Sequence, residues 1–153
     1  MLSLAETVSA RIRADGVKIK VVSVGIRDYD LKYASHQCSL CSATDLTRDI
    51  YNAACRCFDE LWQGIPIRHL GIHTSQVTKE SVYQINLFEK VDYEKMKCME
   101  RTVDSLRKRY GQDVIKRAVF LMPKEKSDIY IDHMGGGISR EKRTVDYTKE
   151  TIL

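Results

Sequence analysis

The stretch VKIKVVSVGIRDYDLKYASHQCSL, residues 17–40, predicts a β-hairpin. In its first half, β-branched residues alternate with small or polar ones: Val22, Ser23, Val24, Gly25, Ile26 and Arg27. This alternation is typical of a strand that buries one face and exposes the other. Asp28, Tyr29 and Asp30 predict a turn, and residues 32–40 predict the returning strand.

The segment before the hairpin predicts an amphipathic helix over residues 3–14. Apolar residues recur there at three- and four-residue spacing, and Gly16 follows as a stop signal. Ser3 and Glu6 fit a capping box, in which each side chain satisfies a free amide of the first turn.

A second helix and one more strand follow the hairpin. Thr44 and Asp45 are N-cap candidates for a helix whose apolar stripe covers residues 46–61, and residues 65–75 predict a strand. Two amphipathic helices and an antiparallel sheet predict an α+β fold with both helices on one sheet face. The other face, rich in Lys, Arg, Ser and Gly, is then left to solvent or to a ligand.

The remaining chain predicts three further regions after a domain at residues 1–76. Residues 77–91 have no useful period and predict an exposed linker. Residues 92–122 predict a C-terminal helical extension, with a clear helix to residue 110 and a strand-like VFLM at its end. Residues 123–153 are polar and predict a mobile tail.

Composition narrows the class of protein. The 25 Lys and Arg residues exceed the 21 Asp and Glu residues by four, and eight basic residues against three acidic ones fall in residues 101–126. No apolar run approaches the roughly 18 residues of a membrane helix, and the first residues do not resemble a signal peptide. We therefore expect a cytoplasmic protein without a membrane partner. Five cysteines, an odd number, do not suggest a disulfide framework.

Five stretches together carry a resemblance to a known family: SLAETVSARIRADG, KVVSVGIRDYDL, ASHQCSL, TDLTRDIYNAACRCFDELWQG and PIRHLGIHTSQV. Their order and spacing resemble the little-finger domain of Y-family DNA polymerases, especially the bacterial UmuC-like branch. The resemblance covers residues 2–122, and the tail GGGISREKRTVDY also looks like endings in this branch.

The resemblance implies a non-catalytic module of an error-prone translesion polymerase that acts in DNA repair and the SOS response. In the family this domain holds primer–template DNA by its backbone rather than its bases. The candidate DNA-binding residues are Lys18, Lys20, Ser23, Gly25, Arg27, His36 and Arg68. The small residues among them would let strand amides approach phosphates closely.

A second motif, QINLF, lies in the predicted linker. It resembles the pentapeptide with which bacterial polymerases bind the β sliding clamp. Leu87 and Phe88 would be apolar anchors in a pocket, and the Gln84 amide would occupy a polar subsite. The alternative is a short strand that turns Ile85, Leu87 and Phe88 toward a core.

The sequence offers no catalytic residues of its own. Family members hold two Mg²⁺ ions with carboxylates of an upstream palm domain, and no such motif occurs here. We expect no metal or cofactor in this chain, and its partners would include the palm, fingers and thumb domains of a parent polymerase.

The resemblance also implies a missing strand. The family domain opens with a strand before its first helix, whereas this sequence begins with the helix. In a ferredoxin-like order that strand lies inside the sheet, beside the last strand, so its absence predicts a gap and a fragment of a longer polymerase. Residues 118–122, residues 128–131 or a strand of a second copy would fill the gap.

Two other functions remain open at this point. The chain could be a protein-interaction module that uses only the clamp-binding peptide and leaves the basic face in solvent. It could instead be a small enzyme or metal-binding domain that uses His36, Cys38 and Cys41, although a lone CxxC lacks the second pair that a zinc site needs.

Overall fold

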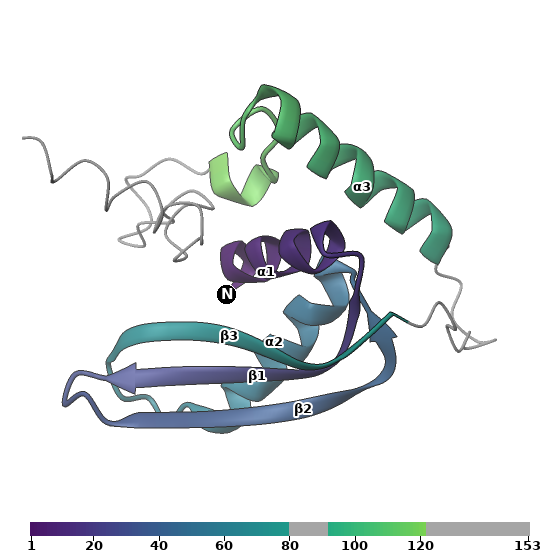
Figure 1. Cartoon of the computed structure of the whole chain (residues 1–153). Helices are drawn as coiled ribbons and strands as arrows, with labels where there is room; N and C mark the ends of the chain where they lie inside the picture. The colour runs from purple at the N-terminus through teal and green to yellow at the C-terminus, as the bar shows by residue number, and fades with distance from the viewer. Residues whose placement is uncertain (80–91, 122–153) are drawn as a thin grey trace, which may run out of the picture.

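The predicted hairpin forms two of the three strands of the sheet, and its first strand is the central one. A computed structural model describes residues 1–79 and 92–121. In chain order its elements are α1 (Leu2–Ala14), β1 (Lys18–Asp28), β2 (Tyr33–Thr44), α2 (Thr47–Leu61), β3 (Ile67–Thr78), α3 (Tyr93–Tyr110) and the 3₁₀ helix η1 (Ala118–Leu121) (Figure 1). The α+β class is confirmed.

The sheet has the strand order β2-β1-β3, and both outer strands run antiparallel to β1. Val22 and Val24 are fully buried, and their cross-strand partners Cys38 and Ile72 pack against the same core. Directly opposite residues share a face of an antiparallel sheet. The alternation read from β1 therefore extends across all three strands.

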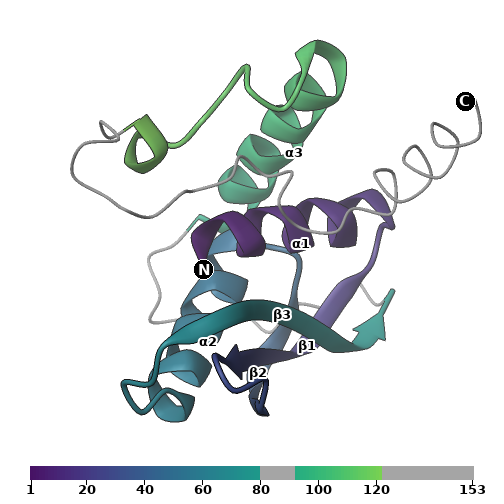
Figure 2. The same cartoon turned by 90° about the vertical axis from the view of Figure 1, so that its left-hand side faces the viewer.

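Both helices cover this same face, as predicted (Figure 2). The buried core joins them to the strands and contains Ala5, Ile12, Ile19, Val22, Val24, Ile50, Ala53, Ala54 and Cys57. Each fully buried Ile or Val contributes about 1.5–3 kcal/mol through the hydrophobic effect. The core therefore fixes which side of the sheet is closed and which is open.

The expected interior gap is wrong. β3 pairs directly with β1 from Lys18↔Thr78 to Asp28↔Ile67, so no empty strand position separates β3 from its neighbour. Of the expected substitutes, the stretch from Ala118 to Leu121 forms η1 rather than a strand, and residues 128–131 lie outside the described residues. The position proposed for a strand of a second copy does not exist between these strands.

The capping box at the start of α1 is also wrong. The N-cap is Met1, and no side chain caps the helix, which places Ser3 inside the first turn. Glu6 is only 3% exposed and accepts hydrogen bonds from Arg107 at 3.4 Å and from Arg117. Its carboxylate faces the C-terminal extension instead of the backbone of its own helix.

α3 docks on the domain through a second buried ionic contact. The Arg13 guanidinium of α1 donates to Asp104 at 2.5 and 3.1 Å and to Glu100 at 2.6 Å. It also donates to the Asp45 carbonyl at 2.9 Å and the Thr47 hydroxyl at 3.3 Å. Burial opposes the charged form, but the hydrogen bond to Asp104 and the charge of Glu100 outweigh it and raise the pKa of Arg13. One side chain thus joins α1, α3 and the start of α2.

Glu100 completes the start of α2 from another helix. The Thr47 amide donates to the two oxygens of Glu100 at 3.1 and 3.2 Å. The N-cap position belongs to Leu46 and has no side-chain cap, while Thr44 accepts from the Leu46 amide at 3.1 Å. Because a helix N-terminus carries free amides and a partial positive charge, a carboxylate there is favourable.

Arg13→Gln should destabilise the protein by about 3–5 kcal/mol, because it leaves the buried Glu100 and the half-buried Asp104 without their cation. Urea unfolding followed by circular dichroism measures the loss. Arg56→Gln is the control, since Arg56 is exposed on α2, and its effect should stay within about 0.5 kcal/mol. Equal midpoints for the two variants would contradict the role given to Arg13.

Candidate nucleic-acid interface

The face of the sheet that the helices leave open has a regular layout. The register places four rows across β2, β1 and β3, in this order: Tyr33–Arg27–His69, Ser35–Gly25–Gly71, Gln37–Ser23–His73 and Ser39–Val21–Ser75. Rows on one face are about 6.7 Å apart, because alternate residues of a strand share a face. We call this surface the open face.

The open face carries positive and polar groups. Arg27 lies on its central strand, and His69 and His73 lie on β3. Among the row positions that the register defines, none is Asp or Glu. Apart from Val21, Gly25 and Gly71, these residues have hydroxyl, amide, imidazole, guanidinium or phenol groups. Such a surface attracts anions and offers them hydrogen-bond donors.

Two glycines lie side by side in the second row, but their surroundings differ. A Cβ at Gly25 would come within 2.5 Å of the Tyr33 hydroxyl, so the Tyr33 ring lies over this glycine. A Cβ at Gly71 would meet only His69 and His73, each at 3.6 Å, which is ordinary contact. The second row is therefore covered at Gly25 by the Tyr33 ring and bordered at Gly71 by two imidazoles.

The structure brings together three of the predicted DNA-binding residues. Ser23, Gly25 and Arg27 lie in successive rows of the open face. Lys18 and Lys20 lie at the other end of β1, beyond a register shift between Ile19 and Val21. Lys20 is exposed and Lys18 is half-buried.

The other two predicted residues lie elsewhere. His36 pairs with Val24 across the strands, which puts it on the helix side of the sheet. Its Nε2 lies 2.7 Å from a carboxylate oxygen of Glu60 on α2. Arg68 is exposed and has no ladder partner, because Arg27 pairs with His69 and Asp28 with Ile67. The register shift between Arg27 and Asp28 marks a β-bulge, and a bulge changes the direction of side chains at a sheet edge.

Sequence patterns alone missed Tyr33, His69 and His73. Tyr33 was assigned only to the returning strand, and the four histidines seemed scattered along the chain. The register shows that His69 and His73 flank a glycine on one face. A period-two reading of β3 from Leu70 and Ile72 would have found both, since residues at odd positions face away from that core.

The metal-binding alternative gains no support. Within the part of the chain that the structure describes, no three His, Cys, Asp or Glu side chains are placed to hold a metal ion. Cys41 is exposed, while the Cys38 thiol lies 3.7 Å from the Ala53 carbonyl. Burial, followed by a hydrogen bond with Cys38, raises the pKa of Cys57 to about 12, so this thiol stays protonated.

Comparison with known proteins assigns the family. Residues 1–87 match the impB/mucB/samB family C-terminal domain. The chain belongs to this family. The impB/mucB/samB C-terminal domain is the one that the sequence patterns resembled, so the resemblance to the little finger of Y-family DNA polymerases is confirmed.

Individual relatives of the impB/mucB/samB domain support this assignment. The chain is 36% identical to DNA polymerase IV of Clostridium acetobutylicum over 126 residues, which are 82% of the chain and 32% of that relative. It is 36% identical to DNA polymerase IV 2 of Bacillus subtilis, over 79% of the chain and 30% of the relative. A putative UV-damage repair protein UvrX of Bacillus subtilis is 29% identical over 80% of the chain.

The chain spans about a third of the length of these relatives. The match to a C-terminal domain agrees with the expectation that the chain corresponds to the C-terminal part of a polymerase. Among the described helices of this impB/mucB/samB domain, none combines the length and the apolar character that crossing a membrane requires. The QINLF motif, with Gln84, Leu87 and Phe88, lies outside the described residues, so its predicted role stays a prediction.

Gly25→Ala should displace the Tyr33 ring while leaving the fold intact, because the new methyl group needs the space of the Tyr33 hydroxyl. The ring resonances of Tyr33 in NMR spectra report the displacement. Gly71→Ala is the matched control in the same row and should leave Tyr33 unchanged. Identical Tyr33 resonances in both variants would show that the ring does not lie over Gly25.

Proposed function

We propose that the open face binds duplex DNA through its sugar-phosphate backbone, as the DNA-holding module of a translesion polymerase in DNA repair. The absence of carboxylates from the rows that carry Arg27, His69 and His73 is the main support. Each phosphate neutralised by a basic side chain releases condensed counterions, which drives binding without reading sequence.

The side chains of the open face suit the backbone better than the bases. Most of them are short: four are serines, and Ser35 of β2 lies directly beside Gly25 in the second row. Hydroxyls and basic groups are typical phosphate and sugar contacts, whereas base edges are read by longer side chains that enter a groove. A polymerase that copies damaged templates needs a contact of this sequence-independent kind.

The rest of the polymerase would supply catalysis. Relatives of this domain are named DNA polymerase IV, and the palm, fingers and thumb of such a parent would hold Mg²⁺ and nucleotide. This chain would keep the primer–template in place during error-prone synthesis, in the cytoplasm and as part of the SOS response.

We also propose that QINLF docks the polymerase on the β sliding clamp. The motif follows β3 by a few residues and precedes α3, so it connects two elements that the domain holds in place. An extended peptide with two apolar anchors, Leu87 and Phe88, fits a hydrophobic pocket on a partner.

Arg27→Gln should weaken duplex binding about equally for all sequences and reduce the slope of log K against log salt by about one. Fluorescence anisotropy with a labelled primer–template duplex over a salt series measures both. Arg48→Gln is the matched control, because Arg48 is exposed on α2, away from the open face.

An unchanged slope for Arg27→Gln would remove Arg27 from the interface. If the unmodified chain bound no duplex at low salt, the DNA-binding proposal would be wrong. The protein-interaction module that uses only the clamp peptide would then be the better description.

Leu87→Ala combined with Phe88→Ala should abolish retention of the chain on immobilised β clamp, because both apolar anchors are lost. Duplex binding by the same variant should be unchanged if the two surfaces are separate. Asn86→Ala, within the same pentapeptide, is the control for loss of a non-anchor side chain. Full retention of the double variant would exclude this docking mode.

A further inference from the structure

α3 segregates its charges between two faces. Its sequence holds six basic residues against three acidic ones, the acids being Glu94, Glu100 and Asp104. Glu100 and Asp104 turn inward and bind Arg13. The outward side therefore keeps most of the basic residues and only Glu94, which pairs with Lys97 at 2.8 Å. That hydrogen bond also lowers the pKa of Glu94.

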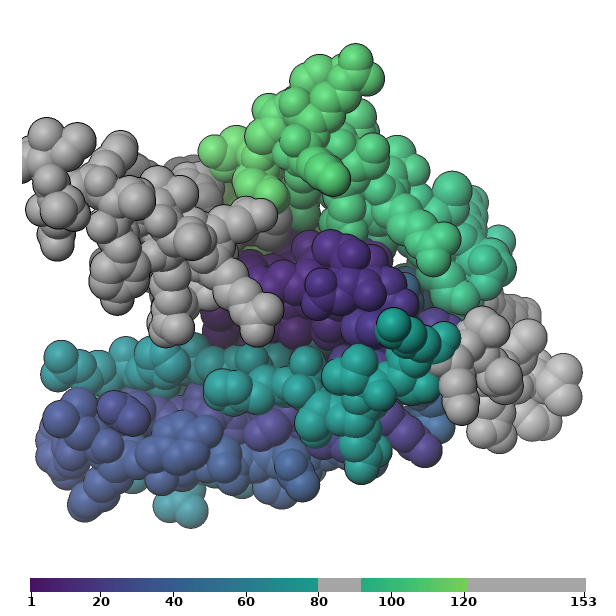
Figure 3. Space-filling view, in the orientation of Figure 1, coloured from purple at the N-terminus to yellow at the C-terminus, as the bar shows by residue number. Residues whose placement is uncertain are grey.

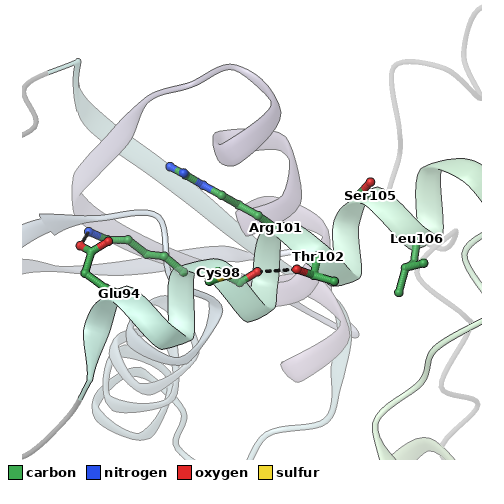
Figure 4. Close-up of a pocket in the computed structure, with 7 residues that line it drawn as sticks. Glu94, Cys98, Arg101, Thr102, Ser105 and Leu106 are labelled. Carbon is green, nitrogen blue, oxygen red and sulfur yellow. Dashed lines mark hydrogen bonds and ion pairs between the residues drawn. The ribbon is translucent and has the colours of Figure 1, made fainter.

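The outward residues form a continuous stripe. Helical spacing places Lys95, Arg101, Lys108 and Arg109 around a centre formed by Cys98, Thr102 and Ser105. All of these side chains are exposed. A hollow of about 420 Å³ lies along the stripe. Figure 4 shows those of its lining residues that the structure describes, which belong to α3, and the Thr102 hydroxyl donates to the Cys98 carbonyl at 2.8 Å. We call this surface the outer stripe.

Helix stability alone does not account for the outer stripe. Lys108 and Arg109 favour the C-terminal end of the helix dipole, but Lys95 lies in the first turn, where positive charge is unfavourable. Arg101 lies in the middle of the helix and has no acidic partner at ion-pair distance among the described residues. A ligand with repeated negative charge would use all four.

We propose that the outer stripe of α3 is a second nucleic-acid-binding surface, distinct from the open face of the sheet. Arg101 and Lys108 are seven residues apart, about 10.5 Å along the helix, which matches about three phosphates of one DNA strand. The Ser105 hydroxyl lies between the basic groups and is of the type that donates to phosphate oxygens, whereas the Thr102 hydroxyl already donates to the Cys98 carbonyl.

The centre of the outer stripe argues for nucleic acid over a protein partner. Protein interfaces depend on buried apolar or aromatic anchors, whereas Cys98, Thr102 and Ser105 are small. The exposed apolar residues Met99 and Tyr110 lie to one side of the stripe by helical spacing. The phosphates of a nucleic-acid strand, lying between two rows of basic side chains, fit these features.

The outer stripe and the open face cannot contact the same short segment of straight duplex. α1 lies between the sheet and α3 in both cartoon views (Figures 1 and 2), and its surface separates theirs on the side drawn in Figure 3. The second surface would therefore hold another stretch of nucleic acid, such as a bent or single-stranded continuation.

Arg101→Gln combined with Lys108→Gln tests this inference on the full chain. Two lost phosphate contacts should reduce the salt slope by about 1.8 on duplex and by about 1.4 on a single strand. Arg48→Gln combined with Arg56→Gln removes the same charge from exposed positions of α2 and should change the slope little. Gln keeps a helix propensity close to that of Arg and Lys, and circular dichroism checks that α3 is retained.

The outcomes separate this surface from the open face. If the α3 variant keeps its slope while Arg27→Gln loses one unit, the inference is wrong and the proposed function stands. If only the α3 variant loses slope, the outer stripe is the DNA contact and the open face is not. Equal losses in the α2 control would reduce the effect to net charge and overturn the inference. Vesicles of phosphatidylserine or a poly-glutamate peptide that compete as well as DNA would overturn the choice of ligand.

Discussion

The Arg13 guanidinium is the contact on which the arrangement of the elements depends. It lies between helices that are far apart in the sequence, and it contacts two carboxylates of α3 as well as the backbone just before α2. Removing three charges from water is costly, and only a full set of hydrogen bonds offsets that cost. Glu100 contributes to this set twice, because its carboxylate also accepts the Thr47 amide. The orientation of these hydrogen bonds positions α3. Arg13 binds both carboxylate oxygens of Asp104, while Glu100 must reach the amide at the start of α2.

Because several acidic residues pair with arginines, the exposed surface of the protein is more positive than its composition suggests. Glu100 and Asp104 are directed to Arg13, and Glu6 is directed to the buried Arg107, so these acids do little to offset the basic residues outside. The modest net charge of +4 therefore understates the positive character of exposed surfaces. Composition could not reveal this, because a count of charges does not record which of them are paired and buried.

Features that depend on neighbouring residues could be predicted from the sequence, whereas features that depend on contacts between distant residues could not. The alternation of Val22, Val24 and Ile26 predicted one closed and one open face, and this was right because a strand's period is a local property. The capping box was wrong because Glu6 finds its partners Arg107 and Arg117 about a hundred residues away. His36 was expected among the DNA contacts, but it lies on the helix side of the sheet. The face of a β2 side chain depends on the pairing register with β1, because a shift of one residue moves every side chain of a strand to the other face. The gap beside β3 was expected by analogy with a strand order that this sheet does not have.

The two glycines of the open face show how one small difference controls access to the strand backbone on that face. Strand amides can approach a phosphate only where no side chain intervenes, which is the physical advantage of glycine there. Gly71 satisfies this condition as the structure stands, with His69 and His73 on either side. Gly25 satisfies it only when Tyr33 moves, and Tyr33 is held by no hydrogen bond to its hydroxyl among those that join the described residues. A phosphate that approached this row would therefore contact Gly71 first. It would contact Gly25 on the central strand only after displacing the exposed ring of Tyr33. Tyr33 is 57% exposed and lies outside the buried core, so displacing its ring would uncover Gly25 without disturbing the packing beneath the sheet.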